Sequence, residues 1–152
     1  MKSISYQNFF HSHFDDLPLN DDVLFGKIFL SEKHHYLIEE AKNCDLKAIE
    51  QLKDMFVYGK KGTTPNFEVA KRYWYALHSV AELSCCKIAI SLSLDEYANI
   101  LEIFKRPLIE QAEAYAFAIS YTTSELTTDN WGISVLQKQL ARLEEIQDIL
   151  NQ

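Results

Sequence analysis

The sequence predicts an all-α fold: a short right-handed superhelical stack of antiparallel helix pairs that ends in a long C-terminal capping helix. Residues 65–76 and 107–118 share one pattern at a spacing of 42 residues, in which a proline opens each copy and Tyr73 matches Tyr115. Repeats of about 20 to 50 residues are typical of helical repeat proteins. Apolar residues also recur at helical spacing, and only 4 Gly and 3 Pro leave few turns for a β fold.

Composition limits the kinds of partner. The chain has 152 residues and a formal net charge of −7. A negative surface repels phosphate backbones, so we expect no nucleic-acid ligand, whereas a basic protein is attracted. No stretch approaches the roughly 18 apolar residues of a membrane span, and the N-terminal residues contain no apolar signal core. We therefore expect a cytoplasmic protein without a membrane partner.

The three cysteines are an odd number, which excludes a complete disulfide framework. Cys44 stands alone, whereas Cys85 and Cys86 are adjacent. All three lie in segments that the pattern assigns to helices. We expect reduced thiols that are at least partly buried, which fits a reducing compartment.

Residues 1–152 are expected to form one helical-repeat domain, whose residues 1–44 hold an N-terminal irregular segment and capping helices. The aromatic stretch 1–19 predicts a short helix or an extended segment packed onto the body of the protein. Helices are predicted over 21–31 and 33–42. Their expected inner faces consist of Val23, Leu24, Ile28, Leu30, Tyr36, Leu37, Ile38 and Ala41.

Residues 45–58 give the strongest helical pattern. Asp45 is suited to cap this helix, and Asn66 is suited to cap the next one, over 67–82. The apolar face of the first helix is formed by Leu46, Ile49, Leu52, Met55 and Phe56. The opposite, polar face is formed by Lys47, Glu50, Gln51, Lys53 and Asp54. Between the helices, two glycines permit a turn with positive φ.

Segment 45–82 also carries a more specific pattern. It runs through Ala48, Leu52, Phe56, Gly59, Gly62, Asn66, Ala70, Tyr73 and Trp74. In these residues the segment resembles a Sel-like repeat of the tetratricopeptide superfamily. The resemblance implies two helices that approach closely at small residues, aromatic side chains that fill the gap to the neighbouring pair, and glycines that reverse the chain. It also implies a concave protein-binding face built from the first helix of each pair.

A degenerate copy of the repeat covers residues 83–124. One or two helices are predicted over 84–105 and another over 107–123, without a glycine turn between them. A final helix is expected within 129–151, as a cap on the repeat stack or, in the alternative, as a coiled-coil seam. Its expected inner stripe is Ile133, Leu136, Leu140, Leu143 and Leu150.

The sequence gives no recognisable catalytic arrangement. It lacks a Gly-x-Ser-x-Gly motif, a phosphate loop and a dinucleotide fingerprint. We therefore predict a protein that is not an enzyme, with no catalytic residue, cofactor or metal. An alternative metal-binding group is His11, His13, Asp15 and Asp16, but no second ligand cluster has suitable spacing.

Helical repeat proteins bind other proteins along a surface. Tyr73, Trp74 and Tyr75 span about 200° of a helix turn, so at least one of them should reach the surface. The predicted partner-binding residues are Tyr75, Arg72, His78, Trp74, Glu50 and Asp54. Trp74 is also a candidate for the core of the repeat, together with Tyr73.

The first functional hypothesis is a non-catalytic protein-binding module, and within that class a bacterial immunity protein that neutralises a toxin. Many toxins that act on nucleic acid are basic, and an acidic inhibitor binds them rapidly. The alternative is a cytoplasmic adaptor or regulatory scaffold of the Sel-like type. A different class is an enzyme or a small-ligand-binding protein, with a pocket among His34, His35, Tyr73 and His78. Neither the partner nor the oligomeric state follows from the sequence.

Overall fold

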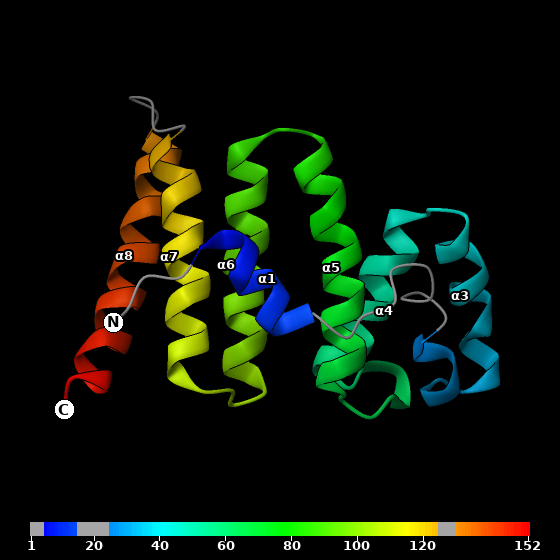
Figure 1. Cartoon of the computed structure of the whole chain (residues 1–152). Helices are drawn as coiled ribbons and strands as arrows, with labels where there is room; N and C mark the ends of the chain where they lie inside the picture. The colour runs from blue at the N-terminus through cyan, green and yellow to red at the C-terminus, as the bar shows by residue number, and fades with distance from the viewer. Residues whose placement is uncertain (1–4, 15–24, 125–129) are drawn as a thin grey trace. The chain divides into compact units, whose positions relative to one another are not determined.

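The computed structural model describes residues 5–14, 25–124 and 130–152 (Figure 1). Within these ranges the regular structure consists of seven α-helices and three 3-10 helices, and no strand is present. This confirms the predicted all-α class. None of these helices combines the length and the apolar composition needed to cross a membrane.

The chain forms two compact units. Residues 16–80 form one, here called the internal unit, and residues 1–15 together with 81–152 form the other, here called the split unit. The split unit is discontinuous in sequence because the N-terminal helix belongs with the C-terminal helices. The expected single domain over 1–152 stays a prediction.

The described part of the internal unit contains three α-helices and three short 3-10 helices whose two ends both lie in the described residues. They are η1 (Gly26–Phe29), η2 (Glu32–His34), α3 (His35–Lys42), α4 (Leu46–Tyr58), η3 (Lys60–Gly62) and α5 (Phe67–Leu83). Residues 81–83 at the end of α5 belong to the split unit. The helices predicted over 33–42, 45–58 and 67–82 are confirmed. Over 21–31 the described residues hold Phe25 in α-helical assignment, followed by η1, and residues 21–24 lie outside the described ranges, so the helix predicted there stays a prediction.

Side chains cap α4 and α5 as predicted. The carboxylate of Asp45 accepts hydrogen bonds from the backbone N–H groups of Lys47 (3.0 Å) and Ala48 (3.3 Å). At the start of α5, Asn66 Oδ1 accepts from the N–H of Val69 (3.2 Å). These oxygens satisfy N–H groups that have no partner inside the helix.

The turn between α4 and α5 depends on its glycines. Gly59 and Gly62 have φ of +71° and +74°, in the left-handed region that side chains disfavour. A Cβ on Gly59 would also lie 3.1 Å from the ring of Pro65 and from the carbonyl oxygen of Thr63. The predicted positive φ is therefore confirmed at both glycines.

Large side chains from α4 and α5 fill the core of the internal unit. Phe56, Tyr73 and Trp74 are fully buried. The rings of Phe56 and Tyr73 stack with centroids 6.1 Å apart, and the ring of Trp74 stacks on His78 with centroids 4.7 Å apart. A Cβ on Gly26 would lie 2.5 Å from Tyr73 Oη, so this close approach requires a glycine. The prediction that Tyr73 and Trp74 form the core is confirmed.

Four side chains of the internal unit contradict the predicted faces. Tyr36, Leu46 and Ile28 are exposed, whereas Lys53 is buried. Tyr36 lies roughly 150° around α3 from the buried face formed by its neighbours, and Leu46 is the first residue of α4. Lys53 places its Nζ 3.5 Å from the carboxylate of Asp54, while its aliphatic stem packs inside.

Four α-helices lie in the described residues of the split unit. They are α1 (Tyr6–Phe14), α6 (Lys87–Ile103), α7 (Leu108–Ser124) and α8 (Asn130–Leu150). The pattern over 84–105 therefore forms one helix. α7 lies beside both α6 and α8 (Figure 1). The buried ring of Phe9 on α1 lies 5.2 Å from the Phe117 ring and 6.2 Å from the Tyr97 ring. The expected N-terminal segment is thus a short helix held by aromatic contacts.

A ring of hydrogen bonds lies inside the split unit. Gln139 Nε2 donates to Ser91 Oγ (3.0 Å), and Thr122 Oγ1 donates to Gln139 Oε1 (2.8 Å). The hydroxyls of Ser91 and Thr122 also contact each other, and Ser91 additionally reaches the carbonyl oxygen of Ala118. The three side chains are at most 2% exposed and come from α6, α7 and α8. This network fixes the register of the three helices.

The buried face of α8 differs from the predicted stripe. Ile133, Leu140 and Leu150 are exposed by 36%, 41% and 43%, whereas Gln139 and Ile146 are buried. The two buried residues, Gln139 and Ile146, are seven positions apart and lie on the same face of α8. The hydrogen bonds of Gln139 stabilise its polar side chain in this buried position. The buried face is therefore rotated by roughly 60° around the helix from the predicted stripe, whose Leu136 and Leu143 are partly buried.

Non-glycine residues form the turns between several helices. Cys44, Cys85 and Lys105 have φ of 63°, 56° and 54° at the C-terminal ends of α3, α5 and α6. All three cysteines are exposed, which contradicts the expected burial. The physical reason is that Cys44 and Cys85 lie in surface turns, and Cys86 is the residue before α6.

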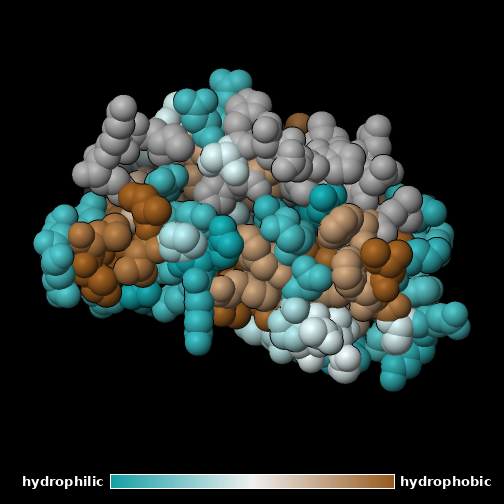
Figure 2. Space-filling model, turned by 60° about the horizontal axis from the view of Figure 1, so that its bottom comes forward, coloured by the Kyte–Doolittle hydropathy of each residue, from teal (hydrophilic) through white to brown (hydrophobic). Residues whose placement is uncertain are grey.

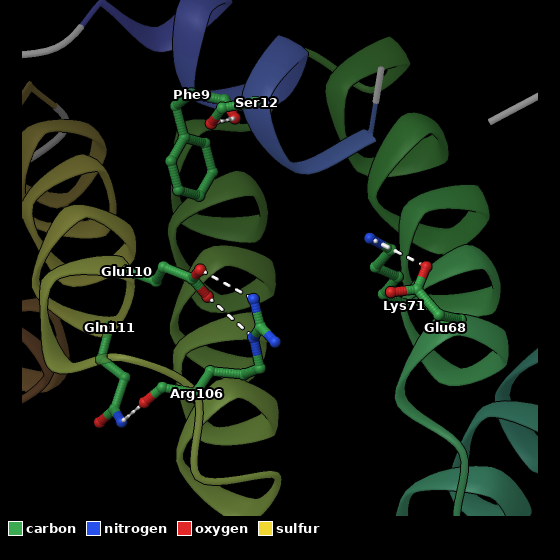
Figure 3. Close-up of polar contacts among 7 residues, drawn as sticks. All are labelled: Phe9, Ser12, Glu68, Lys71, Arg106, Glu110 and Gln111. Atoms are coloured by element: carbon green, nitrogen blue, oxygen red, sulfur yellow. Dashed lines mark hydrogen bonds and ion pairs between the residues drawn. The ribbon is translucent and has the colours of Figure 1, made fainter. Parts of the chain in front are cut away.

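Polar contacts hold the turn between α6 and α7 (Figure 3). The N–H of Arg106 donates to the carbonyl of Leu101 (2.9 Å), which closes the end of α6 around Lys105. The guanidinium of Arg106 makes two bonds to Glu110, of 3.1 and 3.0 Å. Gln111 Nε2 donates to the Arg106 carbonyl (3.0 Å). The α6–α7 turn is therefore stabilised by polar capping contacts, whereas the α4–α5 turn relies on glycines.

Candidate functional site

Three of the predicted partner-binding residues are buried. Trp74 and His78 are fully buried, and Arg72 is 7% exposed. The guanidinium of Arg72 lies 3.7 Å above the ring centroid of Phe25. The burial of Arg72 and His78 contradicts the exposure expected of them, because α5 turns a wide face into the core of the internal unit. The partner-binding role of the three residues stays a prediction. Tyr75, also predicted to contact a partner, is partly exposed.

The other two predicted residues, Glu50 and Asp54, lie together in a surface cleft of about 360 Å³. We call it the α4 cleft. Its remaining lining residues are Lys47, Gln51, Met55, Lys60 and Lys61. Residues three and four apart share one face of a helix, so α4 supplies most of the lining. The glycine turn then brings the two lysines of η3 beside that face.

Two lysines of the α4 cleft, Lys60 and Lys61, are not among the residues predicted from the sequence to contact a partner. Lys60 and Lys61 follow Gly59, whose positive φ reverses the chain back toward the polar face of α4. The available signal was the position of this basic pair directly after a glycine at the end of an amphipathic helix. The cleft consequently presents both signs of charge around Met55.

A second cleft, of about 420 Å³, lies within the split unit. We call it the α6–α8 cleft. It is lined by Leu92, Asp95, Asn99 and Glu102 from α6, Tyr115 from α7, and Val135, Lys138, Gln139 and Arg142 from α8. In each of the two flanking helices the lining residues recur at helical spacing, so one face of each helix forms a wall.

Burial raises the pKa of two groups in the α6–α8 cleft. Tyr115 is 4% exposed, and its Oη donates to Asn99 Oδ1 (3.2 Å). Burial, with the Asp95 carboxylate adding to it, raises the pKa of Tyr115 to about 12, so the phenol stays protonated at neutral pH. Burial, followed by repulsion from Glu96, also raises the pKa of Asp95 above its usual value.

An ion-pair network lies at the Glu102 end of the α6–α8 cleft. Arg142 Nη2 lies 2.8 Å from Glu102 Oε1, and Arg142 Nη1 lies 2.9 Å from Glu145 Oε2. This guanidinium joins α8 to α6. Asp95 and Lys138, by contrast, have no ion-pair partner in the described part of the chain.

None of the residues that line the α6–α8 cleft is among the site residues predicted from the sequence. The signal of this cleft was a set of polar residues on α6, including Asn99, within a helix otherwise rich in apolar residues. The opposite wall of the cleft, which α8 forms, can be recognised only when the buried side of that helix is known.

The alternative sites are not assembled in the described structure. Among the described residues, no three metal-ligating side chains come together. Asp15 and Asp16, and the side chains of His11 and His13, lie outside what is described. Of the pocket expected around His34 and His35, the other members, Tyr73 and His78, are fully buried, and this pocket stays a prediction.

Comparisons with family models, curated proteins and solved structures returned no match for this chain.

Proposed function

We propose that this chain is a non-catalytic helical module that binds a basic protein through the α4 cleft. The observation that carries the proposal is the placement of Glu50 and Asp54 in one surface cleft, beside lysines from α4 and η3. The net charge of −7 attracts a basic partner over a distance. The alternating charges of the cleft then favour one docking register over others.

The proposal includes a finer description of the fold. We take α4 and α5 as an antiparallel pair of the Sel-like type, and α6 and α7 as its degenerate copy in a superhelical stack. Support comes from the buried positions of the repeat pattern, namely Ala48, Leu52, Phe56, Ala70, Tyr73 and Trp74. In such a stack the first helix of each pair lines the concave face, and α4 is a first helix.

Within this class, our first candidate is a bacterial immunity protein that neutralises a basic toxin. Its support is the acidity of the chain and the charged α4 cleft. The second candidate is a cytoplasmic adaptor of the Sel-like type, which the repeat pattern favours. The two differ in their partners: an immunity protein has one dedicated toxin, whereas an adaptor binds several cellular proteins.

The test uses the products of neighbouring genes. Each basic candidate toxin is assayed for activity with and without an excess of this protein, and its affinity is measured by calorimetry. We expect one toxin to be inhibited, with binding that weakens as salt is added. The immunity proposal fails if every candidate toxin stays fully active, and the adaptor candidate is then tested against purified cellular partners.

A charge-reversal pair locates the surface. Glu50→Lys combined with Asp54→Lys should weaken binding at least tenfold. The control is Glu144→Lys with Asp148→Lys, which makes the same change in net charge at the same spacing on an exposed face of α8. Equal weakening by both pairs would contradict the α4 cleft as the contact surface and would leave only a general effect of charge.

A further inference from the structure

The α6–α8 cleft has walls of different chemical character. α6 contributes the carboxylates of Asp95 and Glu102, whereas α8 contributes the cations of Lys138 and Arg142. The volume of about 420 Å³ lies in the range of roughly 300 to 1,000 Å³ that is usual for small-molecule pockets. The cleft is therefore large enough for a small polar molecule, and it offers that molecule both signs of charge.

The charges at the two ends of the cleft differ in their partners. At one end, Glu102 and Arg142 neutralise each other through their 2.8 Å contact. Asp95 and Lys138 have no such ion pair among the described residues, so an incoming ligand finds one available anion and one available cation. Asp95 is partly buried next to Glu96 and Tyr115, where a bound cation would relieve its unfavourable surroundings.

We propose that the α6–α8 cleft binds a small zwitterion of the α-amino-acid class. Asp95 binds its ammonium group, Lys138 binds its carboxylate, and an apolar side chain packs on Leu92 and Val135. This site is independent of the α4 cleft and of the proposed protein partner.

Neighbouring groups define the shape of the site. Tyr115 forms part of the lining, and its hydroxyl is held by Asn99 at 3.2 Å. Gln139 also lines the cleft while its amide bonds Ser91 and Thr122 in the interior, so this part of the wall is rigid. A lining that is fixed before binding reduces the entropy lost when a ligand is held.

The test compares three probes that share the same isobutyl group: L-leucine, 3-methylbutan-1-amine and 4-methylpentanoate. Binding to the full chain is measured by NMR titration of the backbone amides. We expect L-leucine to bind and to shift the amides of α6 and α8, with each singly charged probe at least tenfold weaker. No binding of L-leucine at millimolar concentration, or equal binding of a singly charged probe, would overturn the proposal.

Two substitutions locate the contacts. Asp95→Asn and Lys138→Met should each weaken L-leucine binding at least tenfold, and the Asn variant should weaken the amine probe more than the carboxylate probe. The matched controls are Asp148→Asn on α8 and Lys87→Met on α6, which are exposed and outside the lining. Circular dichroism checks that each variant is folded. Unchanged binding in both folded cleft variants would place the ligand elsewhere and reject this site.

Discussion

The internal unit stacks aromatic rings in its core, whereas the split unit encloses a ring of hydrogen bonds. In the internal unit, Phe56, Tyr73 and Trp74 are fully buried side chains that pack by shape and area. In the split unit, Ser91, Thr122 and Gln139 are equally inaccessible but satisfy one another. The split unit therefore adds directional bonds to an apolar core that includes Phe9 and Tyr97, whereas the described core of α4 and α5 relies on ring packing.

The two kinds of core fail in different ways. Apolar contacts weaken in proportion to the area and volume removed. A closed hydrogen-bond ring is weakened when one member is lost, because each remaining polar group stays buried with one hydrogen-bond partner fewer. This difference also affects the surfaces, since the side chain of Gln139 lies both in the ring and in the wall of the α6–α8 cleft.

The largest expected effect tests the aromatic core. Trp74→Ala should lower the free energy of unfolding by about 3 to 5 kcal/mol, because it removes a fully buried ring and leaves a cavity. Chemical denaturation measures the loss. The control, Trp131→Ala, removes the same side chain from a position that is 51% exposed and should cost under about 1 kcal/mol. Similar losses in both variants would show that the described burial is not what stabilises the unit.

The next effect tests the hydrogen-bond ring. Gln139→Ala should lower the free energy of unfolding by about 2 to 3 kcal/mol, because the hydroxyls of Ser91 and Thr122 each lose a partner. The combined variant Ser91→Ala, Thr122→Val and Gln139→Leu should lose less than the single variant, since it leaves no buried polar side chain in the ring with a lost hydrogen bond. Denaturation of both variants checks the order. A triple variant that is less stable than Gln139→Ala would contradict this account.

The smallest effect compares the turns of the two units. Lys105→Gly in the split unit should raise the free energy of unfolding by about 0.5 to 1 kcal/mol, because glycine adopts its φ of 54° without a steric penalty. Gly59→Ala in the internal unit should lower it by about 1 to 2 kcal/mol, since its φ is +71°. Thermal unfolding followed by circular dichroism measures both. Changes of the same sign would show that φ does not determine the stability of these turns.

Local signals explain which parts of the fold were predictable. Asp45 and Asn66 cap their helices through groups only two or three residues away, so their roles are visible in the sequence. The same holds for Gly59 and Gly62, whose turn is a local property of the backbone. Of the candidate site, Glu50 and Asp54 were predictable because four residues bring two side chains onto one face of a helix.

Long-range packing explains why the sequence mispredicts the burial of several polar residues. Arg72 and His78 carry polar groups and were assigned to the surface, yet one packs on Phe25 and the other on Trp74. Hydropathy cannot reveal such pairs, because aromatic rings stabilise a buried cation or imidazole only when the fold brings them together. Hydropathy likewise cannot reveal the burial of Gln139 on α8, because its hydrogen-bond partners come from α6 and α7.

The sequence by itself determined the all-helical class, the main helices, their caps and the glycine turn, because each depends on residues within one or two turns of a helix. Only the tertiary structure decided which side of α8 is buried, that the cysteines are exposed, and that Asp95 and Lys138 line one cleft. Those outcomes depend on side chains brought together from distant segments, where packing and hydrogen bonding outweigh local hydropathy.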